Sequence, residues 1–340
     1  MDFRSDNVSG VSPEIMEAME AANPGPSTPY GQDDLSVRVE ARFSEIFETP
    51  VSSFLVLTGT AANGLALSAL AEPISAIYCH EAAHIHKAEG GAPEFFTGGA
   101  KLLTLPGKHG KISAGTLAEA LAEPMNGPNY MPRAALSLTQ ASEAGTLYAP
   151  DEISALAQLV RPHGMGLHMD GARFANALAA LGVAPADITW RAGIDILSFG
   201  ASKNGTMGAE AVIFFDPAKA AEFSHRCKRS GHMPSKSRFL AAQLLAYLED
   251  GRWLDWAGHA NLMAHHLAEE LGGLAGVSFT HPVEVNILFV EMPDAMAAGL
   301  LAEGFKFHRR AETGQARLVC AFNTSPEDVE AFITCARNLV

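Results

Sequence analysis

A turn with the sequence Thr58-Gly59-Thr60 follows a short apolar run, SFLVL, and precedes a stretch rich in alanine and leucine. The apolar run predicts a strand, and the later stretch predicts a helix. Glycine lets the backbone approach a ligand, and the first turn of a helix offers free N–H groups and a positive dipole end to an anion. Gly59 and Thr60 are therefore candidates for binding a phosphate, although most such turns only connect a strand to a helix.

A carboxylate, Asp170, ends the aliphatic run GLHM, and Gly171 and Arg173 follow it. In an open α/β sheet, the C-terminal ends of the strands line the ligand crevice. A carboxylate at that edge is partly buried and needs a cationic or N–H partner. Asp170 is thus a candidate ligand-binding residue, and the alternative is that it caps a helix or pairs with Arg173.

A lysine, Lys203, follows a buried run, IDILSFGAS, and precedes a glycine-rich loop, NGTMGA. Because burying an ammonium group is costly, a lysine is seldom placed at the inner edge of a sheet without a function. An amine in such a place can form a covalent bond with a carbonyl compound. The alternative is an ordinary exposed loop lysine.

The order of these three features indicates a specific cofactor. A phosphate-binding turn, a strand-end aspartate and a strand-end lysine are the parts needed to hold pyridoxal 5'-phosphate. The helix would bind its phosphate, Asp170 would pair with the protonated pyridine nitrogen, and Lys203 would form the Schiff base. His84 lies between the turn and the aspartate in the sequence and could stack on the cofactor ring.

A second interpretation comes from the stretch His80-Glu81-Ala82-Ala83-His84, which matches the H-E-x-x-H pattern of zinc hydrolases. That chemistry requires both histidines on one helix face and a third ligand. The extended form of the pattern has a glycine where this chain has Lys87. We therefore expect no metal site, and we keep a zinc hydrolase as the alternative from a different class.

Apolar runs rich in β-branched residues alternate with helical patterns in the first two thirds of the chain, which predicts a doubly wound α/β fold. The expected strands cover residues 53–59, 74–79, 134–140, 166–171, 194–202 and 211–216, and expected helices include 149–164 and 172–182.

After about residue 239 the pattern changes, which predicts a second, smaller α+β domain. A long helical region covers 238–273, strands are expected at 277–281, 286–292 and 316–322, and a helix capped by Ser325 at 325–339. We expect a large domain over residues 1–238 and a small C-terminal domain over 239–340.

The composition excludes several partners. The formal net charge of −14 over 340 residues argues against binding nucleic acid or an anionic membrane surface. The N-terminus lacks the apolar core of a signal peptide, and the most apolar stretches are too short to span a bilayer. Four cysteines without a C-x-x-C pair indicate reduced thiols, so we expect a cytoplasmic protein.

Seven segments in this order resemble the threonine aldolases, with the related phenylserine aldolases, among the fold-type-I pyridoxal-phosphate enzymes. The resemblance covers nearly the whole chain and implies an aspartate aminotransferase-like fold, with a mostly parallel seven-stranded sheet and a small α+β domain. The segments are FRSDNVSGVSPEIMEAM, YGQDD, TGTAAN, AHIHKAEGGA, HMDGAR, SKNGTMGA and ARLVCAFNTSPEDVE.

The resemblance also implies roles for individual residues. Gly59 and Thr60 would contact the phosphate, His84 would stack on the ring, and Asp170 and Lys203 keep the roles given above. Ser5, Arg173 and Arg317 would hold the carboxylate of an amino-acid substrate, a task that suits the bidentate fork of arginine. In a homodimer or homotetramer with sites near the subunit interfaces, Lys236 would reach the phosphate of a neighbouring subunit, and Tyr30 would lie near a neighbour's site.

The implied activity is cleavage of L-β-hydroxy-α-amino acids to glycine and an aldehyde. Many family members carry a histidine near the substrate hydroxyl, but this chain has LSLTQASEAGT there, as in the phenylserine-aldolase branch. The base could be His84, a bound water or His86. Alternatives on the same scaffold are an aminotransferase, a β-eliminating lyase or a catalytically silent binding protein.

Overall fold

A seven-stranded sheet forms the centre of the computed structural model, which describes residues 1–125 and 127–339. The strand order is β1-β7-β6-β5-β4-β2-β3; β7 runs antiparallel to β1 and β6, and the other neighbours are parallel. The predicted α/β class is confirmed. The strands are β1 (Ser52–Val56), β2 (Ala76–His80), β3 (Lys101–Leu105), β4 (Arg133–Thr139), β5 (Gly166–Gly171), β6 (Ile196–Gly200) and β7 (Glu210–Phe214).

Helices cover both faces of this sheet. Successive side chains of a strand point to opposite faces, so Ile196 and Leu197 of β6 belong to two different apolar clusters. The cluster containing Ile196 packs against α3 (Gly59–Ser68) and α9 (Phe223–Arg229). The cluster containing Leu197 includes α2 (Asp34–Ile46), α7 (Pro150–Val160), α8 (Phe174–Leu181) and α10 (Arg238–Leu248), and further helices are α1 (Pro13–Ala21), α4 (His84–Lys87), α5 (Ala92–Thr97) and α6 (Ala114–Ala122).

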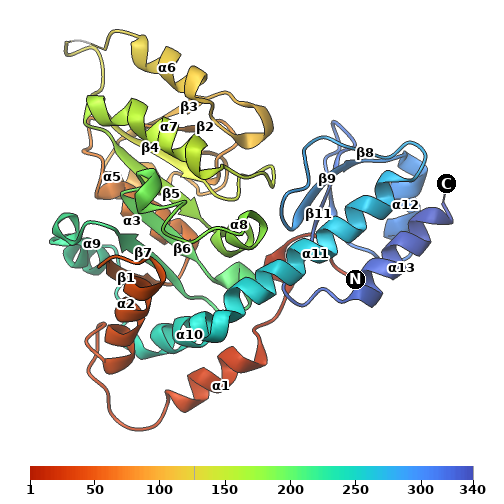
Figure 1. The fold of residues 1–340 in the computed structure, drawn as a ribbon, viewed down its shortest axis with the longest axis horizontal. Coiled ribbons are helices and arrows are strands. Elements are labelled where there is room, and N and C mark those ends of the chain that lie inside the picture. Colours follow the sequence, from red (N-terminus) through yellow and green to blue (C-terminus); the bar gives the residue numbers. More distant parts are fainter. Residues whose placement is uncertain (126, 340) are drawn as a thin grey trace.

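A four-stranded antiparallel sheet with its own apolar core lies at the far end of α11, close to both chain termini (Figure 1). Its strand order is β10-β11-β9-β8, and α12 and α13 pack with α11 in the same core. The elements are α11 (Arg252–Gly272), β8 (Ser278–Phe279), β9 (Ile287–Glu291), α12 (Asp294–Ala302), β10 (His308–Arg309), β11 (Ala316–Val319) and α13 (Pro326–Arg337).

The long helical region predicted over 238–273 is two helices, because the backbone turns at Asp250 and Gly251, both of which have positive φ. Tyr247 and Trp253, on either side of this turn, pack in the core of the large sheet, whereas buried apolar residues of α11 from Met263 onward belong to the second core. The predicted domain boundary at 238/239 therefore stays a prediction. The last residue of the predicted small domain, 340, lies outside the described residues.

The N-terminal segment connects the two sheets. Asp2 bridges Lys306, and the carbonyl of Phe3 accepts a hydrogen bond from the N–H of Val319 on β11. The chain then forms a short 3-10 helix, η1 (Asp6–Val8), which packs against a second one, η5 (Ser202–Asn204). The first residues of the chain thus lie beside the loop that carries Lys203. Across the described ranges, we find no helix with the length and apolarity needed to cross a membrane.

Candidate active site

A cavity of about 360 Å³ lies at the C-terminal ends of the central strands. Its wall includes the turn at Gly59 and Thr60, together with His84, Asp170 and Lys203. These residues come from four separate parts of the chain, and they are the ones that the sequence assigns to the cofactor within one subunit. The fold therefore brings them together.

The turn before α3 has the geometry expected of an anion site. The side chain of Thr58 caps the helix, because its Oγ1 accepts a hydrogen bond from the N–H of Ala61 at 3.1 Å. An added Cβ at Gly59 would meet no atom within 4 Å, so the turn faces open space. The first N–H groups of α3 and its positive dipole end thus face the cavity.

Asp170 is buried at the end of β5, where two N–H donors hold its carboxylate. Oδ1 accepts from the backbone N–H of Ala172 at 3.0 Å, and Oδ2 accepts from Nδ2 of Asn63 at 2.9 Å. The alternative ion pair between Asp170 and Arg173 is wrong, because Arg173 pairs with Asp6. Asp170 thus carries a fixed negative charge on the cavity wall.

Lys203 is half-buried in η5 and lines the cavity, so the alternative of an exposed loop lysine is wrong. The buried carboxylate of Glu210 holds this loop, since it accepts hydrogen bonds from the N–H groups of Ala201 and Ser202 at 3.1 and 3.3 Å. Burial raises the pKa of Glu210 to about 7, although its hydrogen bonds and the charge of Lys203 oppose that shift. The loop that carries the amine is therefore anchored to β7.

His84 begins α4, just after β2, and its ring lines the cavity. Its Nδ1 lies 2.8 Å from Oε1 of Glu89, whose side chain is fully buried. The hydrogen bond with Glu89 raises the pKa of His84 above its ordinary value, and burial opposes this. The ring is therefore anchored at Nδ1, and its other nitrogen remains for chemistry.

The zinc interpretation is wrong because the two histidines of the H-E-x-x-H pattern are not on one helix. His80 ends β2, and its ring bonds the carbonyl of Gly107 and the N–H of Ala82 at 3.1 and 3.0 Å. Glu81 is exposed in the turn before α4. Among residues 1–125 and 127–339, no three His, Cys, Asp or Glu side chains are grouped so that they could hold a metal ion.

Arg173 forms a buried ion pair with Asp6 of the N-terminal segment. Nε and Nη2 bond the two carboxylate oxygens at 2.7 and 2.9 Å, and the two side chains are 5% and 1% exposed. Burial opposes ionisation of Asp6, but the charges of Arg173 and Lys203 lower its pKa overall. Ser5 lies beside this pair, with its Oγ 3.4 Å from Oδ1 of Asp6. The structure thus places Ser5 and Arg173 around a carboxylate of the chain itself.

Arg317 lies on β11 opposite Phe289 and is half-buried. Burial and the charge of Arg173 lower its pKa, whereas the charges of Asp6 and Glu143 raise it. Its guanidinium makes no ion pair with any residue that the structure describes. Arg317 is therefore a cation of the small sheet without an ion-pair partner among the described residues, and the charges of Asp6 and Arg173 both act on it.

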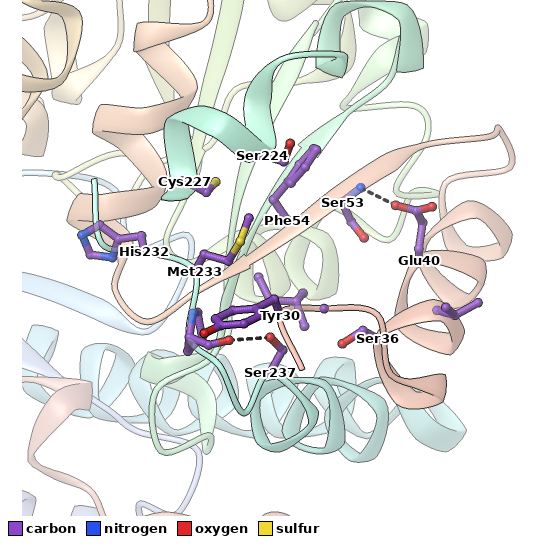
Figure 2. Close-up of a pocket in the computed structure, with 14 residues that line it drawn as sticks. Tyr30, Ser36, Glu40, Ser53, Phe54, Ser224, Cys227, His232, Met233 and Ser237 are labelled. Atoms are coloured by element: carbon purple, nitrogen blue, oxygen red, sulfur yellow. Dashed lines mark hydrogen bonds between the residues drawn. The ribbon is translucent and has the colours of Figure 1, made fainter. Parts of the chain in front are cut away.

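Tyr30 and Lys236 do not enter the cavity of their own chain. Tyr30 lines a second pocket, of about 230 Å³, with His232, Met233 and Ser237 (Figure 2). The N–H of Tyr30 bonds the carbonyl of Ser235 at 3.1 Å, so Tyr30 and the exposed Lys236 lie close together on the surface. His86, one of the candidate bases, is exposed on α4 and does not line the cavity either.

Four polar residues that no sequence pattern indicated hold the site together. Asn63 and Glu89 bond Asp170 and His84, Glu210 holds the Lys203 loop, and Asp6 pairs with Arg173. Three of them lie within the segments that carry the resemblance, but no pattern in the sequence pairs them with their partners. Asp6 follows the candidate Ser5 directly, but Asn63, Glu89 and Glu210 lie three to seven positions from a candidate residue.

The two sheets, the strand order and the cavity define the fold of the fold-type-I pyridoxal-phosphate enzymes. Serine palmitoyltransferase from Sphingomonas wittichii shares this fold, with a TM-score of 0.74 at 16% identity over 100% of this chain and 86% of that one. The structure of threonine aldolase from Leishmania major is more similar, with a TM-score of 0.93 and 27% identity over 99% of both chains.

The chain belongs to the beta-eliminating lyase family, which matches residues 2–295. It is 42% identical to a low specificity L-threonine aldolase of Pseudomonas sp. over 322 residues, 95% of this chain and 93% of the relative. It is 41% identical to a protein of the same name from Pseudomonas aeruginosa over 99% and 96% of the two chains. The resemblance to threonine aldolases is therefore confirmed.

Proposed function

We propose that this protein is a pyridoxal-phosphate-dependent aldolase that cleaves L-β-hydroxy-α-amino acids to glycine and an aldehyde. The single observation that carries the proposal is the meeting of Lys203, Asp170, His84 and the α3 turn in one cavity. Relatives named low specificity L-threonine aldolase, at 41% and 42% identity, support the reaction class. Threonine, allo-threonine and phenylserine are the substrates to compare.

The residues of the cavity fit pyridoxal phosphate. Gly59 and Thr60 would bind the phosphate, Asp170 would accept the pyridinium N–H, His84 would stack on the ring, and Lys203 would bond the aldehyde carbon. The open space above Gly59 and the fixed charge of Asp170 are the features of this chain that meet those needs. When bound, the cofactor would accept the electron pair released from the Cα–Cβ bond.

The chain would then bind the substrate and accept its proton. Arg317, with Ser5 and Arg173 nearby, would hold the carboxylate and so orient the Cα–Cβ bond. The neutral His84 would take the proton of the β-hydroxyl on Nε2, because its Nδ1 is held by Glu89. A bound water is the alternative base.

The decisive experiment compares products and variants. We expect the purified enzyme, given threonine or phenylserine, to release glycine and the matching aldehyde in equal amounts. An aminotransferase would form a keto acid and transfer the amino group, whereas a β-eliminating lyase would form a keto acid and ammonia. Lys203→Ala should lose both turnover and the yellow absorbance of the bound cofactor. Turnover by Lys203→Ala with a normal spectrum would contradict the proposal.

A second proposal concerns which aldehyde part of the substrate the enzyme prefers. The loop at Ser142 and Glu143 carries no histidine, and the Oγ of Ser142 bonds Thr146 at 2.8 Å rather than facing a ligand. We therefore propose that the enzyme acts on phenylserine at least as well as on threonine. The ratio of kcat/KM for the two substrates tests this preference.

We also propose that the enzyme is a cytoplasmic homo-oligomer in which Tyr30 and Lys236 complete the site of a neighbouring subunit. Leu57 and Met207 line the cavity and are 47% and 53% exposed, which favours a covered rim. The test mixes inactive Lys203→Ala chains with Lys236→Ala chains. If Lys236 acts across the interface, hybrids will hold some sites with both residues intact, and activity will exceed that of either variant alone.

A further inference from the structure

An unbroken line of hydrogen bonds joins Asp170 to His84 through two buried residues. Nδ2 of Asn63 bonds Oδ2 of Asp170 at 2.9 Å and Oε1 of Glu89 at 2.8 Å. The same Oε1 lies 2.8 Å from Nδ1 of His84. Asn63 lies on α3, Glu89 follows α4 and Asp170 ends β5, so the line connects three elements around the cavity.

The chemistry of the line requires one orientation of Asn63. An amide nitrogen carries two hydrogens, and here each one points to a carboxylate. The reverse orientation would place the amide oxygen against two acidic groups, which is repulsive. Asn63 therefore donates a hydrogen bond to each carboxylate and so links Glu89 to Asp170.

The side chain of Glu89 has no exposed surface, although the residue borders the cavity. Burial and the charge of Asp170 raise the pKa of Glu89 above its ordinary value, although the hydrogen bonds with His84 and Asn63 oppose that shift. The acidic groups that face His84 are Glu89, Glu143 and Asp170. Of these, only Glu89 bonds the ring. A buried carboxylate bonded to one imidazole nitrogen fixes the tautomer and the angle of the ring.

We propose that Glu89 is a positioning residue that orients His84 over the cofactor and, through Asn63, connects it with the carboxylate of Asp170. This inference rests on the proposed function, since it takes His84 as the stacking residue and base. Glu89 itself touches neither substrate nor cofactor in this assignment. It acts only through His84 and Asn63.

The first test replaces the charge and keeps the shape. Glu89→Gln can still accept a hydrogen bond from Asn63, but it no longer stabilises the charged imidazole. We expect the pKa of His84 in the holoenzyme to fall by roughly 1. It is followed by ring ¹⁵N NMR, with the signal assigned by its loss in His84→Asn. The acid limb of the kcat/KM profile should move to lower pH by the same amount. The plateau of kcat/KM should fall about tenfold, because the imidazole ring of His84 is held less firmly in its orientation.

The matched control is Glu81→Gln, which makes the same change on the exposed turn before α4. We expect this variant to leave the His84 titration and the pH profile as they are in the unaltered enzyme. A residue that only supports the fold would lower kcat/KM in Glu89→Gln without moving the acid limb. An unmoved His84 titration in Glu89→Gln would overturn the proposal.

A second variant tests the link to Asp170 without touching Glu89. Asn63→Ala leaves the two carboxylates without their shared donor, so we expect the dissociation constant for pyridoxal phosphate to rise about tenfold. If the line acts as a unit, the Asn63→Ala/Glu89→Gln double variant will bind the cofactor no more weakly than the worse single variant. Additive losses would show two independent contacts and would contradict the link.

The failure of this inference can be told apart from the failure of the proposed function. If the enzyme releases no glycine from any β-hydroxy-α-amino acid, the aldolase proposal fails, whatever His84 does. The NMR titration and the cofactor dissociation constant do not depend on that reaction. A normal aldolase whose His84 titrates alike in all variants would remove only the role of Glu89.

Discussion

The two arginines assigned to the substrate carboxylate are in opposite electrostatic situations. Arg173 is 5% exposed and bonds both oxygens of Asp6, so its charge is already neutralised. Arg317 is half-buried on the small sheet, and burial together with the charge of Arg173 lowers its pKa. Arg173 is thus already neutralised by Asp6, whereas the charge of Arg317 is available to bind an anion.

This difference indicates that Arg173 and Arg317 have different roles at the boundary of the two sheets. The Asp6–Arg173 pair ties the N-terminal segment to the loop after β5, and Asn286 adds a hydrogen bond to Asp6 at 3.2 Å. Arg317 is then the main candidate to bind the substrate carboxylate. Removing Arg173 should therefore mainly cost stability, whereas removing Arg317 should mainly cost catalysis.

The largest effect, a loss of stability, is expected for the variant Arg173→Leu. This variant leaves Asp6 as an uncompensated buried charge, so we expect the free energy of unfolding to fall by about 3–5 kcal/mol. Urea denaturation measures the change. Asp2→Asn, which breaks the exposed pair between Asp2 and Arg4, is the control and should leave the midpoint unchanged. Equal effects of the two variants would show that burial does not set the strength of the pair.

Next in size is the effect of Arg317→Gln. Losing a charged hydrogen bond to the substrate costs about 1.5–3 kcal/mol, so kcat/KM for threonine should fall by about 10- to 100-fold. The urea midpoint should not fall, because Arg317 makes no ion pair within residues 1–125 and 127–339 that could be lost. Arg310→Gln removes an equal charge from an exposed neighbour and should change kcat/KM less than twofold. Full activity of Arg317→Gln would contradict the assignment of Arg317 to the substrate carboxylate.

A smaller effect should appear at acid pH. The pKa of Asp6 in the folded protein lies below its ordinary value of 3.8, so folding favours the ionised form. The contribution of this group is therefore fully present above pH 3.8 and is lost as the pH falls through the lower, folded value. The difference in unfolding free energy between the unaltered protein and Asp6→Asn should shrink below that pH. Urea midpoints measured from pH 7 to 3 check this, and a constant difference would contradict it.

The smallest effect is expected for Arg191→Gln. Arg191 contacts two carboxylates, Asp187 and Glu48, whereas Arg173 contacts one, but the side chain of Arg191 is 41% exposed. Exposed pairs contribute little because water already solvates both charges. The urea midpoint should stay within experimental error of the unaltered protein. A loss as large as that of Arg173→Leu would show that the number of partners, rather than burial, decides stability.

The fold could be predicted well where apolar runs are continuous. The strand expected at 166–171 is β5 itself, and β2, β6 and β7, which are buried along their whole length, were all expected. The strand β3 was missed because it forms the edge of the sheet, and two of its five residues are exposed. The break between α10 and α11 was missed because it depends on the backbone conformation of Asp250, a residue that many helices contain.

The site could be predicted only in part. Asp170 lies near the end of a buried strand and Lys203 follows one, so the local sequence pattern predicts their place at the strand ends. Asn63 and Glu89 are different: Asn63 bonds Asp170 across 107 positions and Glu89 across 26, and no local pattern pairs Glu89 with His84, five positions before it. In the sequence Glu89 is not distinguished from other acidic residues. The folding of α4 places His84 next to it.

The sequence alone therefore determined the buried strands of the large sheet, the residues that stand at their ends, and the order of turn, histidine, aspartate and lysine. Only the tertiary structure decided which charges are paired. Asp6 and Arg173 are 167 positions apart, and nothing local distinguishes Arg173 from Arg317. Pairing depends on burial and on distances of about 3 Å between groups from different elements, since an ion pair gains strength only where water is excluded. That exclusion exists only after both sheets have packed.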